Sequence, residues 1–193
     1  MAEEIKQLGY EIDENAFEFM RSLENKLIYI DSNIFMGSET SNDEYDITGE
    51  LFDYLNYHKV NIILFKEQYS EIYKLKQNKE NKNSSFLARR AFKRIEKLLN
   101  LEKLTIDDLD IENLSKSYAD PIFIKKIISD IKKNKKVVFI TEDADLRIRL
   151  KSQIKQQKLN KDNLAIYSLE DIEFLNIAIE KDELEEQYWN EYE

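Results

Sequence analysis

The sequence predicts an α/β fold, a three-layer α/β/α sandwich around a central parallel sheet of four or five strands. Short apolar runs rich in β-branched and aromatic residues recur along the chain, which is typical of strands buried on both faces. Longer stretches with helical spacing of apolar residues separate these runs, as a parallel sheet requires. The 193 residues fit one domain better than two.

Four apolar runs are predicted as strands. They are KLIYI (26–30), NIILF (61–65), VVFIT (137–141) and LAIYS (164–168). KLTI (103–106) is a weaker fifth candidate.

Apolar residues at helical spacing predict the helices between the strands. In the stretch 85–100, for example, Leu87, Ala91, Ile95 and Leu98 recur at this spacing. The predicted helices are 49–59, 65–77, 85–100, 118–133 and 143–156. Two further helices are expected outside the sandwich, at 12–25 and at 170–193, the latter running into an acidic, aromatic tail.

Charge divides the chain into three parts. An acidic N-terminal extension (1–25) and an acidic C-terminal tail (177–193) flank a domain at 26–176 that is nearly neutral, although the whole chain carries −10. Lysines and arginines of the central domain cluster, for instance at 89–97 and 147–161, on what are either solvated helix faces or phosphate-binding surfaces. The domain is therefore compatible with a nucleic-acid partner despite the acidic total.

Composition also excludes several kinds of protein. The chain has no cysteine, which excludes disulfides and thiolate metal sites. It begins without the basic and apolar regions of a signal peptide, and no apolar run approaches the length of a membrane span. We therefore expect a soluble, cytoplasmic protein that makes no contact with a membrane.

Acidic residues follow the predicted strands. Asp31 comes directly after the first strand, Glu71 lies in the helix after the second, and Asp120 opens the helix before the strand at 137–141. Asp143 and Asp145 follow that strand closely, just after Thr141. Ligand sites of open parallel sheets lie beyond the carboxyl ends of the strands, so these side chains are expected to converge.

Each acid also has a structural explanation. Asp31, Thr141 or Asp143 could cap the helix that follows, Asp120 before Pro121 is a favourable N-cap, and Glu71 could be solvated. Carboxylates gathered in one cleft would, however, repel strongly unless a cation neutralised them. All the donors are oxygens, and the single histidine, His58, lies on the apolar face of a predicted helix, so Mg²⁺ or Mn²⁺ is favoured over Zn²⁺.

Five motifs together resemble those of the PIN-domain nucleases. They are DSNIF (31–35), EIYKLK (71–76), ARRAFKRIEKL (88–98), DPIFIKKII (120–128) and TEDADLRIRLKS (141–152), and the resemblance covers about residues 26–168. It departs from the family at Lys66, where a proline is common, and in the two acidic extensions.

The resemblance implies a PIN-like fold in which four acids hold one or two Mg²⁺ or Mn²⁺ ions for hydrolysis of RNA phosphodiesters. These acids are Asp31, Glu71, Asp120 and Asp143, with Glu67 as a competing position for Glu71. Asp145 is implied as an accessory metal ligand, and Asn33 and Thr141 as residues that support the ligands. Carboxylate-held ions can supply a hydroxide and neutralise the transition state, so no protein nucleophile is needed.

The resulting expectation is a metal-dependent endoribonuclease, toxin-like or RNA-processing, acting on single-stranded or structured RNA. The residues expected to bind phosphates are Arg147, Arg149, Lys151, Arg89 and Arg90. An antitoxin or another protein partner and a homodimer are compatible with this reading.

Two other functions compete with the endoribonuclease. One is a catalytically silent PIN fold that serves as an RNA-binding or assembly module. The other is a phosphohydrolase or phospho-acceptor fold, which would need a D-x-D motif or an aspartate–lysine pair after the right strands. DSNIF does not supply the D-x-D motif. The acidic tail could also fold over the basic surface and damp activity.

Overall fold

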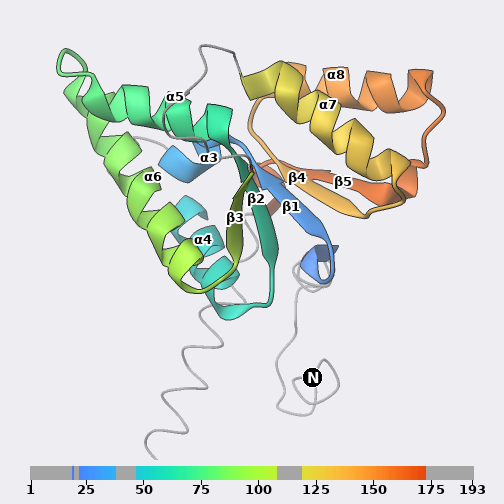
Figure 1. Ribbon diagram of the computed structural model, residues 1–193, viewed down its shortest axis with the longest axis horizontal. Helices are drawn as coiled ribbons and strands as arrows, with labels where there is room; N and C mark the ends of the chain where they lie inside the picture. Colours follow the sequence, from blue (N-terminus) through green and yellow to red (C-terminus); the bar gives the residue numbers. More distant parts are fainter. Residues whose placement is uncertain (1–18, 20–21, 38–46, 108–118, 173–193) are drawn as a thin grey trace, which may run out of the picture.

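A computed structural model describes residue 19 and residues 22–37, 47–107 and 119–172 (Figure 1). The strands are β1 (Leu27–Ile30), β2 (Asn61–Phe65), β3 (Leu104–Asp107), β4 (Val137–Ile140) and β5 (Leu164–Tyr167). The helices are α3 (Ser32–Met36), α4 (Ile47–Tyr57), α5 (Lys66–Gln77), α6 (Lys82–Asn100), α7 (Ala119–Lys132) and α8 (Ala144–Gln156), with short 3₁₀ turns η2 (Lys161–Asn163) and η3 (Glu170–Ile172).

The five strands form one parallel sheet in the order β3-β2-β1-β4-β5, which confirms the predicted fold class and the weak fifth strand. In register, Ile28 of β1 lies beside Ile62 of β2 on one side and beside Val138 of β4 on the other. The chain moves outward in one direction from β1 through β2 to β3, and then returns to add β4 and β5 on the other side. The order therefore reverses between β1 and β4, the place where open α/β sheets bind ligands.

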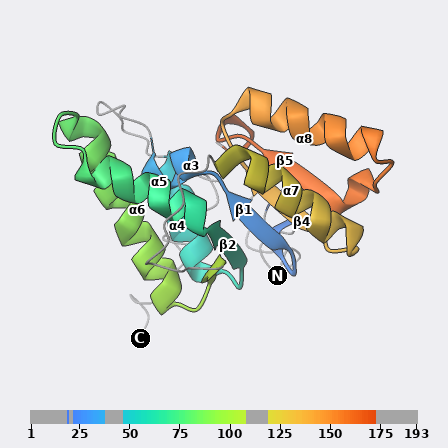
Figure 2. The same cartoon turned by 45° about the horizontal axis from the view of Figure 1, so that its top comes forward.

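Alternate residues of each strand enter two separate cores, one on each face of the sheet. Ile28 and Ile30 of β1 pack under α3–α6, whereas Tyr29 between them packs under α7 and α8. Phe19 and Leu23 join the first core, and Phe123 of α7 and Leu150 of α8 anchor the second. Figure 2 shows α7 and α8 on one side of the sheet and α4–α6 on the other. Burial on both faces explains why the strands read as continuous apolar runs.

The five central helices predicted from the sequence are present within a few residues of the expected bounds. The predicted terminal helices, 12–25 and 170–193, fall largely outside the described residues. In the described part of the chain, no helix is both long and apolar enough to cross a membrane.

One helix, α3, was not predicted. It has five residues, which is too short for a periodic pattern, and it ends at Gly37 with φ of 78°. Arg94 of α6 donates a hydrogen bond of 2.9 Å to the carbonyl of Phe35, close to the C-terminal end of α3. The same guanidinium lies 4.9 Å from the ring centre of Phe52, so this member of the basic cluster has a structural role.

A polar network is buried between the sheet and α7. The hydroxyl of Tyr29 donates a hydrogen bond of 2.5 Å to Asp130, whose side chain is only 2% exposed. The ammonium of Lys135 lies 2.9 Å from the other carboxylate oxygen. The network therefore satisfies a charge that would be unfavourable in the core without partners.

Candidate functional site

Asp31 lies at the carboxyl end of β1, beside the point where the strand order reverses. It occupies the N-cap position of α3, but its side chain makes no capping hydrogen bond. The hydroxyl of Thr141 instead donates a hydrogen bond of 2.8 Å to Oδ2 of Asp31, and the backbone amide of Asp31 donates to the carbonyl of Ile140. The carboxylate is 8% exposed. The explanation of Asp31 as a side-chain cap is therefore wrong, and its carboxylate is held toward β4.

Thr141 connects the two strands that flank the reversal point. Its side chain is fully buried. Its hydroxyl donates to Asp31 and also accepts a hydrogen bond of 3.0 Å from the backbone amide of Asp143. One threonine thus connects the segment after β1 to the segment after β4.

Asp143 is a helix N-cap, one of the roles that the sequence left open for it. Its Oδ1 atom accepts a hydrogen bond of 3.0 Å from the amide of Leu146, so Asp143 caps α8. The side chain is partly exposed. A capping carboxylate can still bind a cation, because one oxygen can accept the backbone hydrogen bond while the other remains a donor to the ion.

The start of α5 is tied to the end of β1. Gln68 is fully buried; its amide nitrogen donates a hydrogen bond of 2.8 Å to the carbonyl of Ile30, and its oxygen accepts one from the amide of Phe65. A turn later, the exposed Glu71 accepts a hydrogen bond of 3.2 Å from the hydroxyl of Ser32. Glu71 is therefore joined to the residue that follows Asp31, and its role as the second acid stays a prediction.

Glu67 is the competing candidate for that position. It lies in the first turn of α5, directly before Gln68, and is 8% exposed. Within the described residues, no hydrogen bond or ion pair joins its carboxylate to another group. A carboxylate that is withdrawn from water without a partner is unfavourable, and a nearby cation would relieve that cost.

Asp120 is the second residue of α7 and is followed by Pro121. The placement of its side chain lies outside the described part of the structure, so both its cap and its metal interpretation stay predictions. The helix itself packs on the second core through Phe123, and it contacts α5.

Two further predicted residues are exposed. Asp145 is 74% exposed and forms an ion pair of 2.9 Å with Arg149, four residues along α8. Asn33 is exposed on α3. Among the residues that the structure describes, no three His, Cys, Asp or Glu side chains come together as a group able to hold a metal ion.

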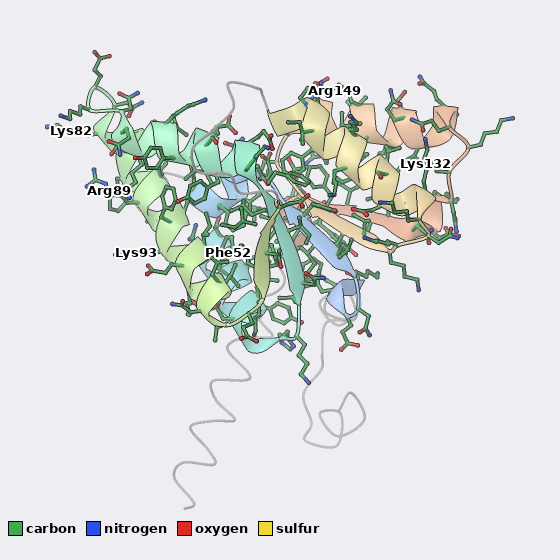
Figure 3. The ribbon with its side chains drawn as sticks, in the orientation of Figure 1. Phe52, Lys82, Arg89, Lys93, Lys132 and Arg149 are labelled. Atoms are coloured by element: carbon green, nitrogen blue, oxygen red, sulfur yellow. The ribbon has the colours of Figure 1, made fainter. Side chains whose placement is uncertain are left out.

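The predicted phosphate-binding residues divide into two groups. Figure 3 places Arg89 with Lys82 and Lys93 along α6, and Arg149 on α8 on another side of the molecule. Arg89 donates hydrogen bonds to the carbonyl and the hydroxyl of Ser85, so it folds back onto its own helix. In the α8 group, Arg147 is joined to Thr141, the residue that donates to Asp31.

Arg147 is anchored at the site. Its Nη1 atom donates a hydrogen bond of 2.8 Å to the carbonyl of Thr141. It also lies near Asp171, which the sequence analysis did not single out. The amide and hydroxyl of Ser168 donate to Asp171, and with Arg147 and Lys151 they hold the pKa of its carboxyl below the usual value, although burial acts in the opposite direction. Asp171 is therefore a further acid, in the short turn η3 that follows β5.

A pattern in the sequence could have identified Asp171. Ser168 follows β5 directly and Asp171 lies three residues later, the spacing of a serine and an acid that satisfy each other's backbone amides at a helix start. Glu142, in the loop after β4, accepts a hydrogen bond from the amide of Leu169. The loops after β4 and β5 are thus joined.

The oxygen-only donor set of this edge fits a hard divalent cation. Asp31 and Glu67 are buried carboxylates. Thr141 connects Asp31 to Asp143, because it donates a hydrogen bond to Asp31 and accepts one from the amide of Asp143. No protein-family model matches the chain, and a search of curated proteins finds no match.

Proposed function

We propose that the protein is a metal-dependent endoribonuclease that hydrolyses RNA phosphodiester bonds at the carboxyl edge of β1 and β4. The observation that carries the proposal is Asp31. Its carboxylate is buried at the reversal point of the sheet, does not cap its helix, and is oriented by Thr141 toward the loop that bears Asp143. The PIN-like motifs supply the reaction class.

Mg²⁺ or Mn²⁺ would be held by Asp31 and Asp143 together with Asp120 and one glutamate of α5. Such an ion lowers the pKa of bound water and stabilises charge on the reacting phosphate. The chain's own contribution is orientation. Thr141 fixes Asp31 through one hydrogen bond and positions Asp143 through another, and Ser32 does the same for Glu71.

Phosphate binding would come from α8. Arg147 is fixed beside the site by Thr141, and Arg149 and Lys151 follow on the same helix. Guanidinium groups bind phosphate oxygens through paired N–H donors, so an anchored arginine can hold a strand at a defined distance from the acids. RNA as partner and a cytoplasmic location belong to this proposal, and an antitoxin or a second copy remains a prediction.

A cleavage assay tests the proposal. Wild-type protein is incubated with mixed RNA and with single-stranded DNA in Mg²⁺, Mn²⁺ or EDTA, beside Asp143→Asn. We expect RNA cleavage in either metal, none in EDTA, and a strongly reduced rate in Asp143→Asn. Cleavage that persists undiminished in EDTA and in the variant would exclude the proposed chemistry.

The two glutamates of α5 can be told apart in the same assay. Because Glu67 is buried without a partner in the described residues whereas Glu71 already accepts from Ser32, we expect Glu67→Gln to lower the metal-dependent rate more than Glu71→Gln. The measurement is the rate as a function of Mn²⁺ concentration. A larger shift in metal dependence for Glu71→Gln would assign the ligand to Glu71.

A silent RNA-binding PIN fold is the second candidate. It is favoured by the lack of any three-acid group among the described side chains. It predicts that wild type and Asp143→Asn bind RNA equally and that neither cleaves it, a pattern that the assay separates from loss of catalysis.

A further inference from the structure

A pocket lined by several lysines lies at the opposite edge of the sheet. It has a volume of about 590 Å³ and is formed where β1, β2 and β4 begin. Its lining residues are Asn25, Lys26, Leu27, Lys59, Val60, Asn61, Asn134, Lys135 and Lys136. The volume is within the range of small-ligand sites. The strands are four or five residues long, so the pocket lies roughly 13–17 Å from the acids.

The pocket carries uncompensated positive charge. Of its lysines, Lys135 is paired with Asp130 at 2.9 Å. The other three, Lys26, Lys59 and Lys136, form no ion pair with any acid in the described residues, and none of the described lining residues is acidic. Partial burial and, after it, the Lys136 ammonium lower the pKa of Lys26, as expected where like charges meet without an anion.

Backbone hydrogen bonds hold the segments that carry Lys26, Lys135 and Lys136. The amide of Lys135 donates a hydrogen bond of 3.1 Å to the carbonyl of Asp130, and Asn134 between them has φ of 57°. The amide of Leu27 donates to the carbonyl of Lys136 at 3.0 Å, which locks the start of β1 to the start of β4. Lysines on a fixed frame lose less freedom when they close on a ligand.

We propose that this pocket binds an anion carrying several phosphate groups. Ammonium groups bind phosphate as point charges, and the amides of Asn25, Asn61 and Asn134 add neutral donors from the same walls. The phosphates come either from a free polyphosphate or from the backbone of RNA. The site is independent of the proposed cleavage chemistry, because none of its residues lies at the edge that holds Asp31.

Binding of inorganic tripolyphosphate, measured by titration calorimetry at low salt in EDTA, tests the proposal. Wild type is compared with the triple variant Lys26→Gln, Lys59→Gln and Lys136→Gln. The matched control is Lys79→Gln, Lys82→Gln and Lys93→Gln, which removes the same charge from exposed positions at and before α6. We expect the pocket variant to bind at least about 10-fold more weakly, and the control to bind within about twofold of wild type.

A second arm identifies the source of the phosphates. A short single-stranded RNA is titrated across a series of salt concentrations into the same proteins. If the pocket holds RNA, its variant loses affinity and the dependence of log affinity on log salt becomes shallower by about 2, from three lost phosphate contacts. If only tripolyphosphate binding falls, the ligand is a free polyphosphate.

The outcomes that overturn the proposal are distinct. Equal weakening in both triple variants would mean general charge attraction, and wild type that binds neither probe saturably would mean that no site exists. Circular dichroism checks that each variant is folded. If the triple variant unfolds, the comparison is repeated with the single variant Lys59→Gln, which changes an exposed residue. Cleavage in Mg²⁺ is recorded separately, so failure here leaves the nuclease proposal intact.

Discussion

Replacing Asp31 with Asn is expected to lower Mg²⁺-dependent RNA cleavage more than about 100-fold while the fold is retained. Loss of a residue that only supports a metal ligand already costs about 10- to 100-fold, so loss of a ligand charge should cost more. Asn keeps the shape of the side chain and an oxygen that can accept the hydrogen bond from Thr141. What disappears is the negative charge.

The control is the same change from Asp to Asn at an exposed position. Asp53 lies exposed on α4, where it pairs with Lys97 at 3.4 Å. Asp53→Asn should cleave RNA at the wild-type rate within about twofold, because exposed pairs contribute little. The measurement is the initial rate at saturating Mg²⁺, with thermal unfolding as the check on folding. An Asp31→Asn variant as active as Asp53→Asn would remove Asp31 from the reaction.

The second large effect concerns stability and not catalysis. Asp130→Ala should lower the free energy of unfolding by about 3 kcal/mol, because it leaves the buried Tyr29 hydroxyl without its acceptor and removes the partner of Lys135. For a chain of this size, that loss corresponds to a fall of roughly 6–12 °C in the melting temperature. Calorimetry or circular dichroism measures it.

This effect depends on pH in a defined direction. Burial alone raises the pKa of Asp130, but hydrogen bonds from Tyr29 and Lys135 outweigh it and hold the pKa below the ordinary 3.8. A lowered pKa in the folded state stabilises the protein above the unfolded value, and this contribution disappears as pH falls through the folded value. The gap between wild type and Asp130→Ala should therefore be full at neutral pH and shrink below about pH 4.

A double-mutant cycle isolates the buried pair. Tyr29→Phe combined with Asp130→Ala should cost less than the sum of the single changes, since each single change leaves the other group without its partner. Asp53→Ala, at an exposed ion pair, should stay within about 0.5 kcal/mol of wild type. Strict additivity in the cycle would show that the short Tyr29–Asp130 contact contributes nothing.

The fold class could be predicted because burial on both faces of a parallel sheet leaves a clear mark in the sequence. The strand VVFI, buried at every residue, stood out for that reason, and even Leu104–Asp107 was found. The order β3-β2-β1-β4-β5 was not predicted, because strand neighbours are set by packing between distant segments. It is this order that places Thr141 beside Asp31.

The site was predicted in part for similar reasons. Position after a strand pointed to Asp31 and Thr141, and motif resemblance pointed to Glu71. The sequence could not distinguish a carboxylate that caps a helix from one that does not. In the structure Asp143 caps α8, whereas Asp31 makes no capping hydrogen bond and accepts one from Thr141. Burial of Glu67 and the contact of Arg94 with Phe35 depend on tertiary packing, which short-range patterns do not encode.

Binding of Mn²⁺ tests most directly whether this edge of the sheet is a metal site. Titration calorimetry on metal-free wild type, Asp31→Asn and Asp53→Asn measures affinity without relying on a substrate. We predict saturable binding to wild type and to Asp53→Asn, and at least about 10-fold weaker binding to Asp31→Asn. Equal affinity in all three proteins, or no saturable binding to wild type, would contradict a metal centre at Asp31.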